Sequence, residues 1–204
     1  MKKKVFYYTS AYFMDVSVEL IQVLKAQVDL YVFIEITHAS KTATILNIDS
    51  LPSEGTMFPA ADILDAAAME NFHSYFEGAK AVNFVVHNYP SANIIKAYAA
   101  SAPVRKMIRE IQPDVLHFEG YTLRTIGLFG MFRSVKKLLL AVHDSQMHSG
   151  MKNLKIILPR FLAFRSRAKK TFVFYSQYSK DDFIKNVRHR AAGYLLLHLY
   201  QLSF

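Results

Sequence analysis

The chain has 204 residues, of which 52% are hydrophobic and 20% charged, a composition typical of a folded domain and not of a disordered segment. It contains no cysteine, which excludes disulfide scaffolds, thiolate metal sites and cysteine nucleophiles. The net charge is +9, but residues 133–190 carry 14 of the 25 Lys and Arg and only three of the 16 acids, so the basic region favours partners with phosphate.

The N-terminus is basic, but the apolar stretch behind it is too short and too polar for a secretory signal, so residues 4–9 are interpreted as a first strand. No window approaches the roughly 18 to 20 apolar residues of a membrane-spanning helix. Together with the lack of cysteine, these features favour a cytoplasmic protein.

Strands and helices alternate along most of the chain. Apolar runs predict strands at residues 4–9, 29–36, 42–48, 81–87, 114–118, 138–142 and 171–175. Apolar residues at helical spacing predict helices at 14–27, 61–79, 102–111, 122–132, 153–165 and 176–186, and a further helix opens at Ser91. Strands separated by helices of this length indicate βαβ units, so we predict an α/β fold with a mostly parallel, Rossmann-like sheet and helices on both faces.

The predicted domain covers residues 1–186. Residues 187–204 carry no charge after Arg190 and show no clear βα continuation. Two interpretations of this apolar tail remain open, a helix that packs on the sheet and the remnant of a truncated chain.

The sequence lacks the motifs of several enzyme classes. No G-x-G-x-x-G follows the first strand and no G-x-x-x-x-G-K-[ST] occurs, which argues against a Rossmann dehydrogenase and a P-loop NTPase. A serine hydrolase would need a G-x-S-x-G elbow, which is also missing. The spacing of His143, Asp144 and His148 matches no familiar set of metal ligands, so we predict no metal site.

Polar residues stand at the carboxyl ends of several predicted strands. The central apolar run stops at His143 and Asp144, and two earlier strands end near His87 and His117, with Glu119 just beyond. In open α/β sheets, ligands bind in the crevice outside these strand ends. We therefore expect the three histidines to share one polar crevice, although a structural hydrogen bond would explain any one of them alone.

Basic and aromatic residues interleave between Lys152 and Lys170. If this segment is helical, it has an apolar side and a cationic surround, which is typical of an interfacial helix on an anionic membrane surface. A core helix with a solvated basic face explains the pattern equally well. No motif that reads nucleic acid accompanies the charge, so we expect no nucleic acid partner.

Three segments form a series in the second half of the chain: IQPDVLHFEG (111–120), KKLLLAVHDS (136–145) and RAKKTFVFYSQYSKDDFIK (167–185). Their order and spacing resemble the N-terminal half of GT-B glycosyltransferases, in particular the retaining, nucleotide-sugar-dependent group that includes glycosyltransferase family 4. In that group, a kPDvvH strand, a strand ending in tvHD and a strand ending in a serine of S-x-x-x-K follow one another. The resemblance covers roughly residues 1–186.

The resemblance implies an acceptor-binding domain that faces a second Rossmann-like domain across a cleft, with His143 against the transferred sugar as the candidate catalytic residue. The residues expected to line the cleft are Ser10, Ala11, Tyr12, His117, Glu119, Tyr121, Asp144 and Ser176. A neutral imidazole can hydrogen-bond a sugar hydroxyl or help stabilise an oxocarbenium-like transition state. Such enzymes generally need no metal, so no cofactor is expected.

The same resemblance implies that the nucleotide-sugar donor is held by a domain that these 204 residues leave no room for. We expect a fragment, a truncated product or one half of a two-chain hexosyltransferase, inactive or nearly so alone. The expected acceptor is a lipid-linked molecule or a saccharide, in polysaccharide or glycolipid biosynthesis at the inner membrane face.

Two other functions remain open. One is a non-catalytic, flavodoxin-like interaction module that binds a membrane or a partner through its basic face. The other is a small-ligand binder of another α/β family.

Overall fold

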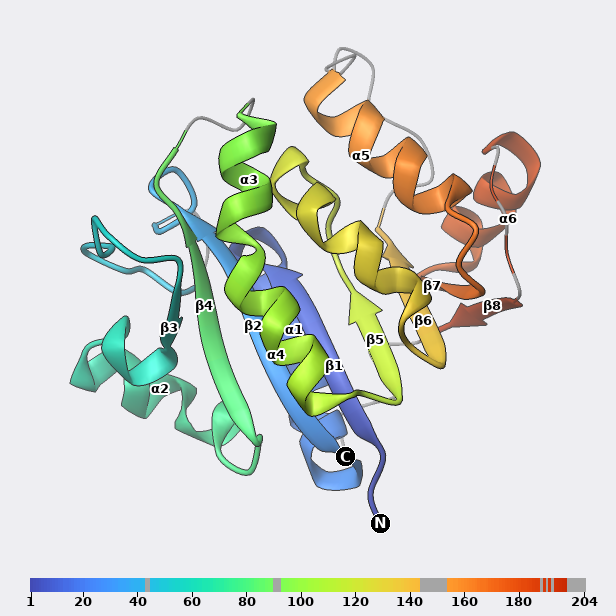
Figure 1. Ribbon diagram of the computed structural model, residues 1–204. Coiled ribbons are helices and arrows are strands. Elements are labelled where there is room, and N and C mark those ends of the chain that lie inside the picture. Colours follow the sequence, from blue (N-terminus) through green and yellow to red (C-terminus); the bar gives the residue numbers. More distant parts are fainter. Residues whose placement is uncertain are drawn as a thin grey trace.

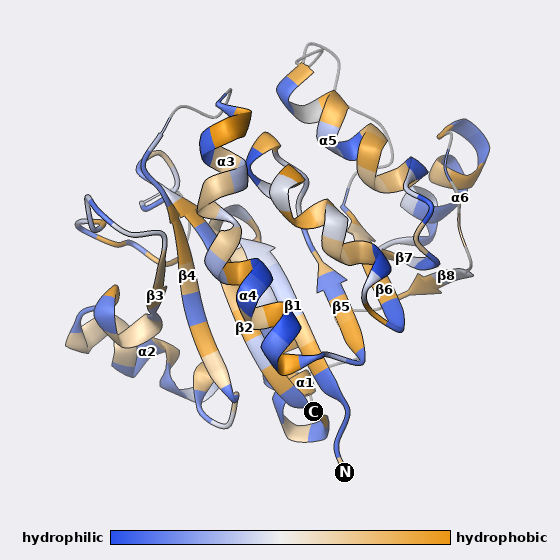
Figure 2. Cartoon of the chain, in the orientation of Figure 1, coloured by the Kyte–Doolittle hydropathy of each residue, from blue (hydrophilic) through white to orange (hydrophobic). Residues whose placement is uncertain are grey.

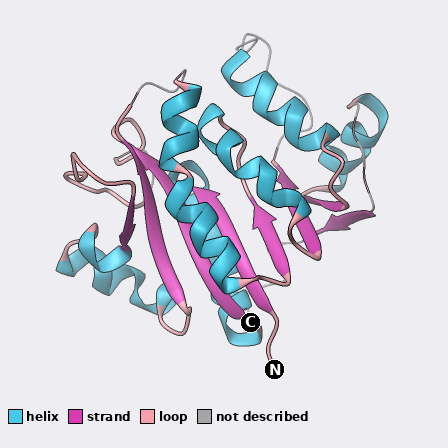
Figure 3. Ribbon diagram, viewed as in Figure 1, coloured by secondary structure: helices cyan, strands magenta, loops and turns pink. Residues whose placement is uncertain are grey.

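The computed structural model describes residues 1–42, 45–89, 93–143, 154–187, 189, 191 and 193–197. The described strands form one eight-stranded sheet in the order β3-β4-β2-β1-β5-β6-β7-β8 (Figures 1 and 3). They are β1 (Lys4–Ser10), β2 (Asp29–Thr37), β3 (Met57–Pro59), β4 (Ala81–His87), β5 (Val115–Phe118), β6 (Lys137–Val142), β7 (Lys170–Phe174) and β8 (Gly193–Leu196). All neighbouring strands are parallel except β3 and β4.

Helices cover both faces of this sheet. They are α1 (Met14–Gln27), α2 (Ala66–Phe76), α3 (Ile94–Ala100), α4 (Ala102–Ile111), α5 (Leu154–Arg165) and α6 (Gln177–Asn186), together with three 3₁₀ segments, η1 (Ala11–Phe13), η2 (Ala60–Asp62) and η3 (Leu123–Arg133). Figure 1 shows α3, α4 and α5 in front of the sheet, while side chains of α1 and α2 pack on the opposite face. The predicted α/β fold, with a mostly parallel sheet between helical layers, is confirmed.

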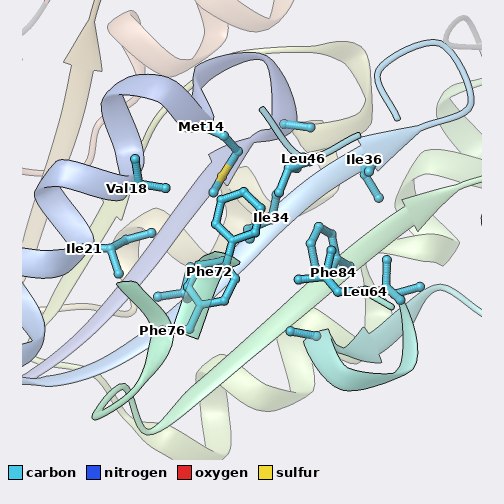
Figure 4. Packing of buried hydrophobic residues seen from close by; sticks show 14 of the residues in the cluster. Met14, Val18, Ile21, Ile34, Ile36, Leu46, Leu64, Phe72, Phe76 and Phe84 are labelled. Carbon is cyan, nitrogen blue, oxygen red and sulfur yellow. The ribbon is translucent and has the colours of Figure 1, made fainter. Parts of the chain in front are cut away.

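The core divides into two clusters because side chains alternate along each strand. Residues such as Tyr7 and Ile34 point to one face, where Phe72 and Phe76 of α2 pack against Ile21 of α1 (Figure 4). Strand residues of the other parity pack under α4, η3, α5 and α6. Hydrophobic residues therefore dominate the central strands, which are buried on both faces (Figure 2).

The strand predicted at residues 42–48 is wrong over the part that the structure describes. Leu46 and Ile48 are buried, but the backbone turns there, and Ile48 N donates to Lys41 O over 2.7 Å. Asn47 has a φ of 40°, which a strand does not allow. The alternation of apolar residues thus reflects a loop whose alternate side chains enter the core.

Two predicted helices differ in extent or type. The helix predicted at 61–79 is shorter, because Asp65 caps α2 by accepting a hydrogen bond from Ala68 N over 2.7 Å, and Gly78 follows the end of the helix with a φ of 86°. The segment predicted at 122–132 is the 3₁₀ segment η3. At Gly127, which lies against α3, a Cβ would meet Ser101 Oγ at 2.6 Å, so this close approach requires glycine.

In the apolar tail, residues 193–196 form β8, a strand parallel to β7, and not a helix. Whether the domain ends at residue 186 stays a prediction. Among the described residues, no helix has the length and apolarity needed to cross a membrane.

Candidate functional site

The sheet changes direction between β1 and β5. After β1 the chain builds β2 and β4 on one side, then crosses over through α3 and α4 and builds β5 to β8 on the other side. At such a switch point the loops after the two central strands diverge and leave a crevice at the carboxyl edge. β1 ends at Ser10, and the loop that leaves β5 contains Gly120.

Gly120 shapes this crevice. Its φ is 82°, and a Cβ on it would lie 2.9 Å from the ring of Phe13. Glycine is therefore required both by the left-handed backbone and by the ring that packs against it.

A cavity of about 610 Å³ opens beside Gly120 at the carboxyl edge of β1, β5 and β6. Its wall is mainly aromatic and apolar, and includes Tyr12, Phe13, Tyr121, Phe164 and His143. The volume falls within the roughly 300 to 1,000 Å³ of small-molecule sites. Rings that present their faces and edges to a hollow of this size suit a ligand with both apolar and hydroxyl-bearing sides, such as a sugar.

His143 is held between two aromatic rings. Its imidazole stacks on Phe13 with ring centres 4.1 Å apart and an interplanar angle of 4°, and on Tyr175 at 4.9 Å and 28°. Only 20% of the side chain is exposed. The two rings fix the plane of the imidazole, so its nitrogens point in set directions.

The inner nitrogen of His143 faces a buried carboxylate. Nε2 lies 3.7 Å from Glu119 Oε2, an ion-pair distance and not a hydrogen bond, and has no other polar partner in the described part of the chain. The ring nitrogen left to meet a ligand in the cavity is therefore Nδ1. A carboxylate behind one nitrogen orients the ring and favours a proton on that side, which makes the other nitrogen an acceptor.

Glu119 is fully buried and collects several polar groups. Tyr175 donates its hydroxyl hydrogen to Oε1, and Ser17 donates to Oε2 over 3.2 Å. His117 Nε2 lies 3.7 Å from Oε1. The cluster thus joins β5, β6, β7 and α1 directly beneath the cavity.

The surroundings of Glu119 and His117 determine which of these two groups is ionised. Burial alone would raise the pKa of the Glu119 carboxyl, but the contact with His143 and the hydrogen bond from Tyr175 outweigh burial and hold the pKa below its usual value. Burial lowers the pKa of His117, so its ring is neutral near pH 7 although Glu119 opposes this shift. The site therefore combines one ionised carboxylate with one neutral buried imidazole.

Solved structures with similar folds include two UDP-N-acetylglucosamine 2-epimerases and a sucrose-phosphate synthase. A UDP-N-acetylglucosamine 2-epimerase superposes with a TM-score of 0.56 at 14% identity, covering 96% of this chain and 48% of its own. The corresponding enzyme of Rickettsia bellii gives 0.57 at 9% identity, with 99% and 47% covered. A sucrose-phosphate synthase from Thermosynechococcus elongatus gives 0.50 at 8% identity, with 94% and 87% covered.

The chain has the fold of one half of a GT-B protein. It spans about half the length of the epimerases, and at these identities the likeness shows the fold alone. No protein-family model matches the sequence, and no curated protein matches it significantly.

Most of the predicted site residues lie in or beneath the 610 Å³ cavity. Ser10, Tyr12, Tyr121 and His143 line the cavity, and Ala11 is buried. His117 and Glu119 lie beneath it, within the polar cluster. Their side chains support the wall and are not exposed on it.

One predicted residue stands elsewhere. Ser176 Oγ accepts a hydrogen bond from Ser179 N over 3.1 Å, so this hydroxyl caps α6. Asp144 lies outside the described residues.

The expected convergence of three histidines is wrong for His87. It ends β4 on the other side of β1, where Nε2 lies 4.0 Å from the buried Glu35. Because Glu35 and Glu119 point to opposite faces of the sheet, the edge carries two polar clusters and not one.

Sequence reasoning missed Phe13, Tyr175 and Glu35. Tyr175 directly follows β7 and has the strand parity that turns its side chain toward Glu119. Glu35 is the one charged residue inside LYVFIEI, the apolar run that follows Asp29. A charge inside a fully buried strand is a signal for a functional or paired site. Nothing in the sequence around Phe13 indicates that its ring stacks on His143.

Proposed function

We propose that this chain is the acceptor-binding half of a glycosyltransferase that uses a nucleotide-sugar donor. The observation that carries the proposal is the fixed imidazole of His143, held by Phe13 and Tyr175 at the wall of the 610 Å³ cavity, with Glu119 behind it. The fold, which is shared with epimerases whose names give UDP-N-acetylglucosamine, supports a nucleotide-sugar substrate class.

In this proposal, Nδ1 of His143 accepts a hydrogen bond from a sugar hydroxyl and so orients the sugar. As positive charge develops on the sugar in an oxocarbenium-like transition state, the carboxylate of Glu119 polarises the imidazole and so strengthens the hydrogen bond that Nδ1 accepts. Tyr12 and Tyr121 bound the sugar on the open side. Tyr121 keeps a fixed position because its hydroxyl donates to Ala141 O over 2.7 Å.

The donor comes from elsewhere in this proposal. Of the described residues that line the cavity, Arg160 alone carries a permanent positive charge, and the chain covers about half of the epimerases. A second domain or a separate chain would bind the nucleotide across the cleft. We expect no transfer by this chain alone.

An NMR titration tests the assignment. The ¹⁵N-labelled chain is titrated with a panel of methyl glycosides and, separately, with UDP-hexoses. We expect at least one glycoside to shift Gly120 and its neighbours, His143→Gln to weaken that binding by about tenfold, and the exposed His73→Gln to leave it unchanged. Binding of the nucleotide with no response to any glycoside would contradict the acceptor role.

Transfer is then assayed with a labelled nucleotide-sugar after mixing the chain with a candidate donor-domain chain. Activity that appears only on mixing supports the two-part enzyme. A complex without transfer to any acceptor favours the interaction module instead.

A second candidate is an epimerase half, because an oriented histidine beside a carboxylate also suits proton transfer at a sugar carbon. The epimerases superpose with TM-scores of 0.56 and 0.57, above that of the synthase. Incubation of the mixed chains with UDP-N-acetylglucosamine in deuterated water separates the two. Deuterium at a sugar carbon indicates epimerisation, whereas glycosyl transfer incorporates none.

We further propose that α5 rests on an anionic membrane surface. Its inner side packs Ala163 and Phe164 on the sheet, while its outer side exposes Leu154, Phe161 and Leu162. Figure 2 shows apolar and polar residues alternating along this helix. Because residues 133–190 carry the excess of basic side chains, an apolar stripe with a cationic surround fits anionic lipid.

Vesicle sedimentation tests the membrane contact. The chain should bind vesicles rich in phosphatidylglycerol, and the double variant Phe161→Ser/Leu162→Ser should bind about tenfold or more weakly because it removes exposed apolar area. Tyr178→Ser is the matched control, since Tyr178 is 80% exposed on α6. Equal binding by both variants would overturn the assignment of α5.

A further inference from the structure

A second cavity lies at the carboxyl edge, on the β2 and β4 side of the switch point. Its volume is about 290 Å³, and its wall includes Thr37, His38, His87, Asn88, Tyr89 and Arg124. None of these side chains is a carboxylate. The volume is at the lower end of the range for small-molecule sites, so the cavity suits one substituent of a ligand better than a whole sugar nucleotide.

Arg124 is the cation of this wall, and its guanidinium is poorly satisfied. Its Nε is buried without a hydrogen-bond partner, and within the described residues the side chain forms neither a hydrogen bond nor an ion pair. A guanidinium withdrawn from water gains strongly from an oxygen-rich anion, which its planar fork can bind through two parallel hydrogen bonds.

The carboxyl group of Glu35 does not form an ion pair with the guanidinium of Arg124. Glu35 lies in the sheet beneath the cavity, where it accepts hydrogen bonds from Tyr8 over 3.2 Å and from Thr122 over 3.1 Å. Burial raises the pKa of the Glu35 carboxyl, although Arg124 and these hydrogen bonds oppose the rise. No ion pair joins Glu35 to Arg124 in the described part of the chain, so this carboxyl does not occupy the guanidinium fork.

Neutral donors surround the cation. His87 is only 2% exposed, and its Nε2 has no hydrogen-bond partner among the residues that the structure describes. Its Nδ1 shares a hydrogen bond of 2.5 Å with the Tyr89 hydroxyl. Asn88 is held in place by donating to Pro52 O over 2.6 Å. The wall therefore combines an arginine with the hydroxyl of Tyr89 and the side-chain amide of Asn88, groups that can contact a tetrahedral oxyanion.

We propose that this cavity binds a phosphoryl group, carried as a phosphomonoester on the acceptor whose sugar occupies the 610 Å³ cavity. Arg124 supplies the charge and the fork, and Tyr89 supplies a neutral contact. The anion site itself stands on the geometry around Arg124, while its assignment to the acceptor rests on the proposed function.

The arrangement of η3 supports the link between the two cavities. Thr122 lines the larger cavity and caps η3, and Arg124 lines the smaller one two residues further on. Thr122 also donates to Glu35, so its position is fixed between the two cavities. A single ligand can then place a sugar on one side of Thr122 and its phosphoryl group on the other.

Titration of the full chain with inorganic phosphate tests the anion site. The titration is monitored by ¹H–¹⁵N NMR at constant ionic strength set with chloride. We expect saturable shifts at His87, Tyr89 and Arg124, and binding at least about tenfold weaker in Arg124→Gln. Arg124→Lys, which keeps the charge without the fork, should bind with intermediate affinity. Arg133→Gln, an exposed arginine on the same segment, is the matched control and should bind as the wild type does.

Urea unfolding of each variant shows whether it remains folded. If Arg124→Gln is unfolded, the comparison of Arg124→Lys with Arg133→Gln decides the matter. Saturable phosphate binding that is equal in the Arg124 and Arg133 variants, or no saturable binding in the wild type, overturns the proposal.

A second titration separates the sources of the group. A panel of hexose phosphates and the matching methyl glycosides is compared with phosphate alone. Hexose phosphate that shifts both Gly120 and Arg124 and binds more tightly than phosphate supports the acceptor assignment. Phosphate binding at Arg124 with no gain from any sugar contradicts that assignment but leaves the sugar cavity to the separate test with glycosides.

Discussion

Among the described residues, Glu35 and Glu119 are the buried carboxyl groups at the carboxyl edge of the sheet, and their environments push their pKa values apart. Glu119 meets His143 and the hydroxyl of Tyr175, which keep its pKa low, whereas burial dominates at Glu35 and raises its pKa. Two carboxyl groups with opposite shifts in neighbouring clusters are typical of sites where each has its own task. Glu119 is suited to remain an anion behind His143, and Glu35 to leave Arg124 available.

Gly120→Ala should disturb the site through Phe13. The substitution places a Cβ 2.9 Å from that ring in a residue with φ of 82°, which we expect to cost about 1–3 kcal/mol. Because Phe13 stacks on His143, the displaced ring should also weaken glycoside binding. Urea unfolding and the glycoside titration measure the two effects, and Gly130→Ala, where a Cβ would meet nothing, is the control. Unchanged stability would contradict the geometry given for Gly120.

His87 should make stability depend on pH. Burial, helped by Arg124, lowers its pKa to about 3, so the folded ring stays neutral while the unfolded one is protonated below its ordinary pKa of about 6.5. Between these values the unfolded state binds more protons, so stability falls as the pH falls. Between pH 7 and 5 we expect the burial of neutral His87 to lower the free energy of unfolding by about 2 kcal/mol.

Urea unfolding at both pH values tests this prediction. His87→Gln should lose less stability on acidification than the wild type, and the exposed His73→Gln should lose as much as the wild type. Equal losses in all three proteins would contradict the neutral, buried state of His87.

At the scale of elements, the termini of helices decide what several polar residues do. Ser176 has the type and position of a substrate ligand at a strand end, but α6 begins there and its first N–H groups need an acceptor. Asp65 provides such an acceptor at the start of α2. A polar residue between a strand and a helix can therefore either bind a ligand or cap the helix, and Ser176 caps α6.

Ser176→Ala should separate these roles. Loss of the cap should lower the free energy of unfolding by about 1 kcal/mol, while glycoside binding at the 610 Å³ cavity stays unchanged. Urea unfolding and the NMR titration measure both, with Ser53→Ala in an exposed loop as the control. Loss of binding at unchanged stability would restore Ser176 as a ligand.

At the scale of the whole molecule, β8 extends the sheet beyond the predicted domain end. Leu197 N donates to Phe174 O over 2.8 Å, and the ring of His189 lies 4.6 Å from that of Phe183. These contacts cover the edge of β7, whose backbone groups would otherwise need another partner.

Truncation tests the predicted end at residue 186. A chain ending at Asn186 should lose about 2 kcal/mol and roughly 4–8 °C in Tm relative to a chain ending at Leu197, because β7 becomes an open edge. Calorimetry on the two chains measures the difference. Equal melting temperatures would show that residues 1–186 form the complete cooperative unit.

Local pattern in the sequence determined the α/β class, the parallel central strands and the placement of His143 and His117 at strand ends, because alternation and helix spacing are short-range properties. It also showed Ser10, Tyr12 and Tyr121 close to those ends. It misassigned residues 42–48, since loop residues that enter a core can imitate the alternation of a strand.

Only the tertiary structure decided which strand ends are neighbours. The order of strands puts β5, β6 and β7 together and sends β4 to the far side of β1, so Glu119 joins His117, His143 and Tyr175 while His87 joins Glu35. Face and neighbour depend on crossover connections between distant segments, and no local run of residues records them. The same long-range packing brings Phe13 onto His143 and places Arg124 at a cavity wall, where its Nε has no hydrogen-bond partner among the described residues.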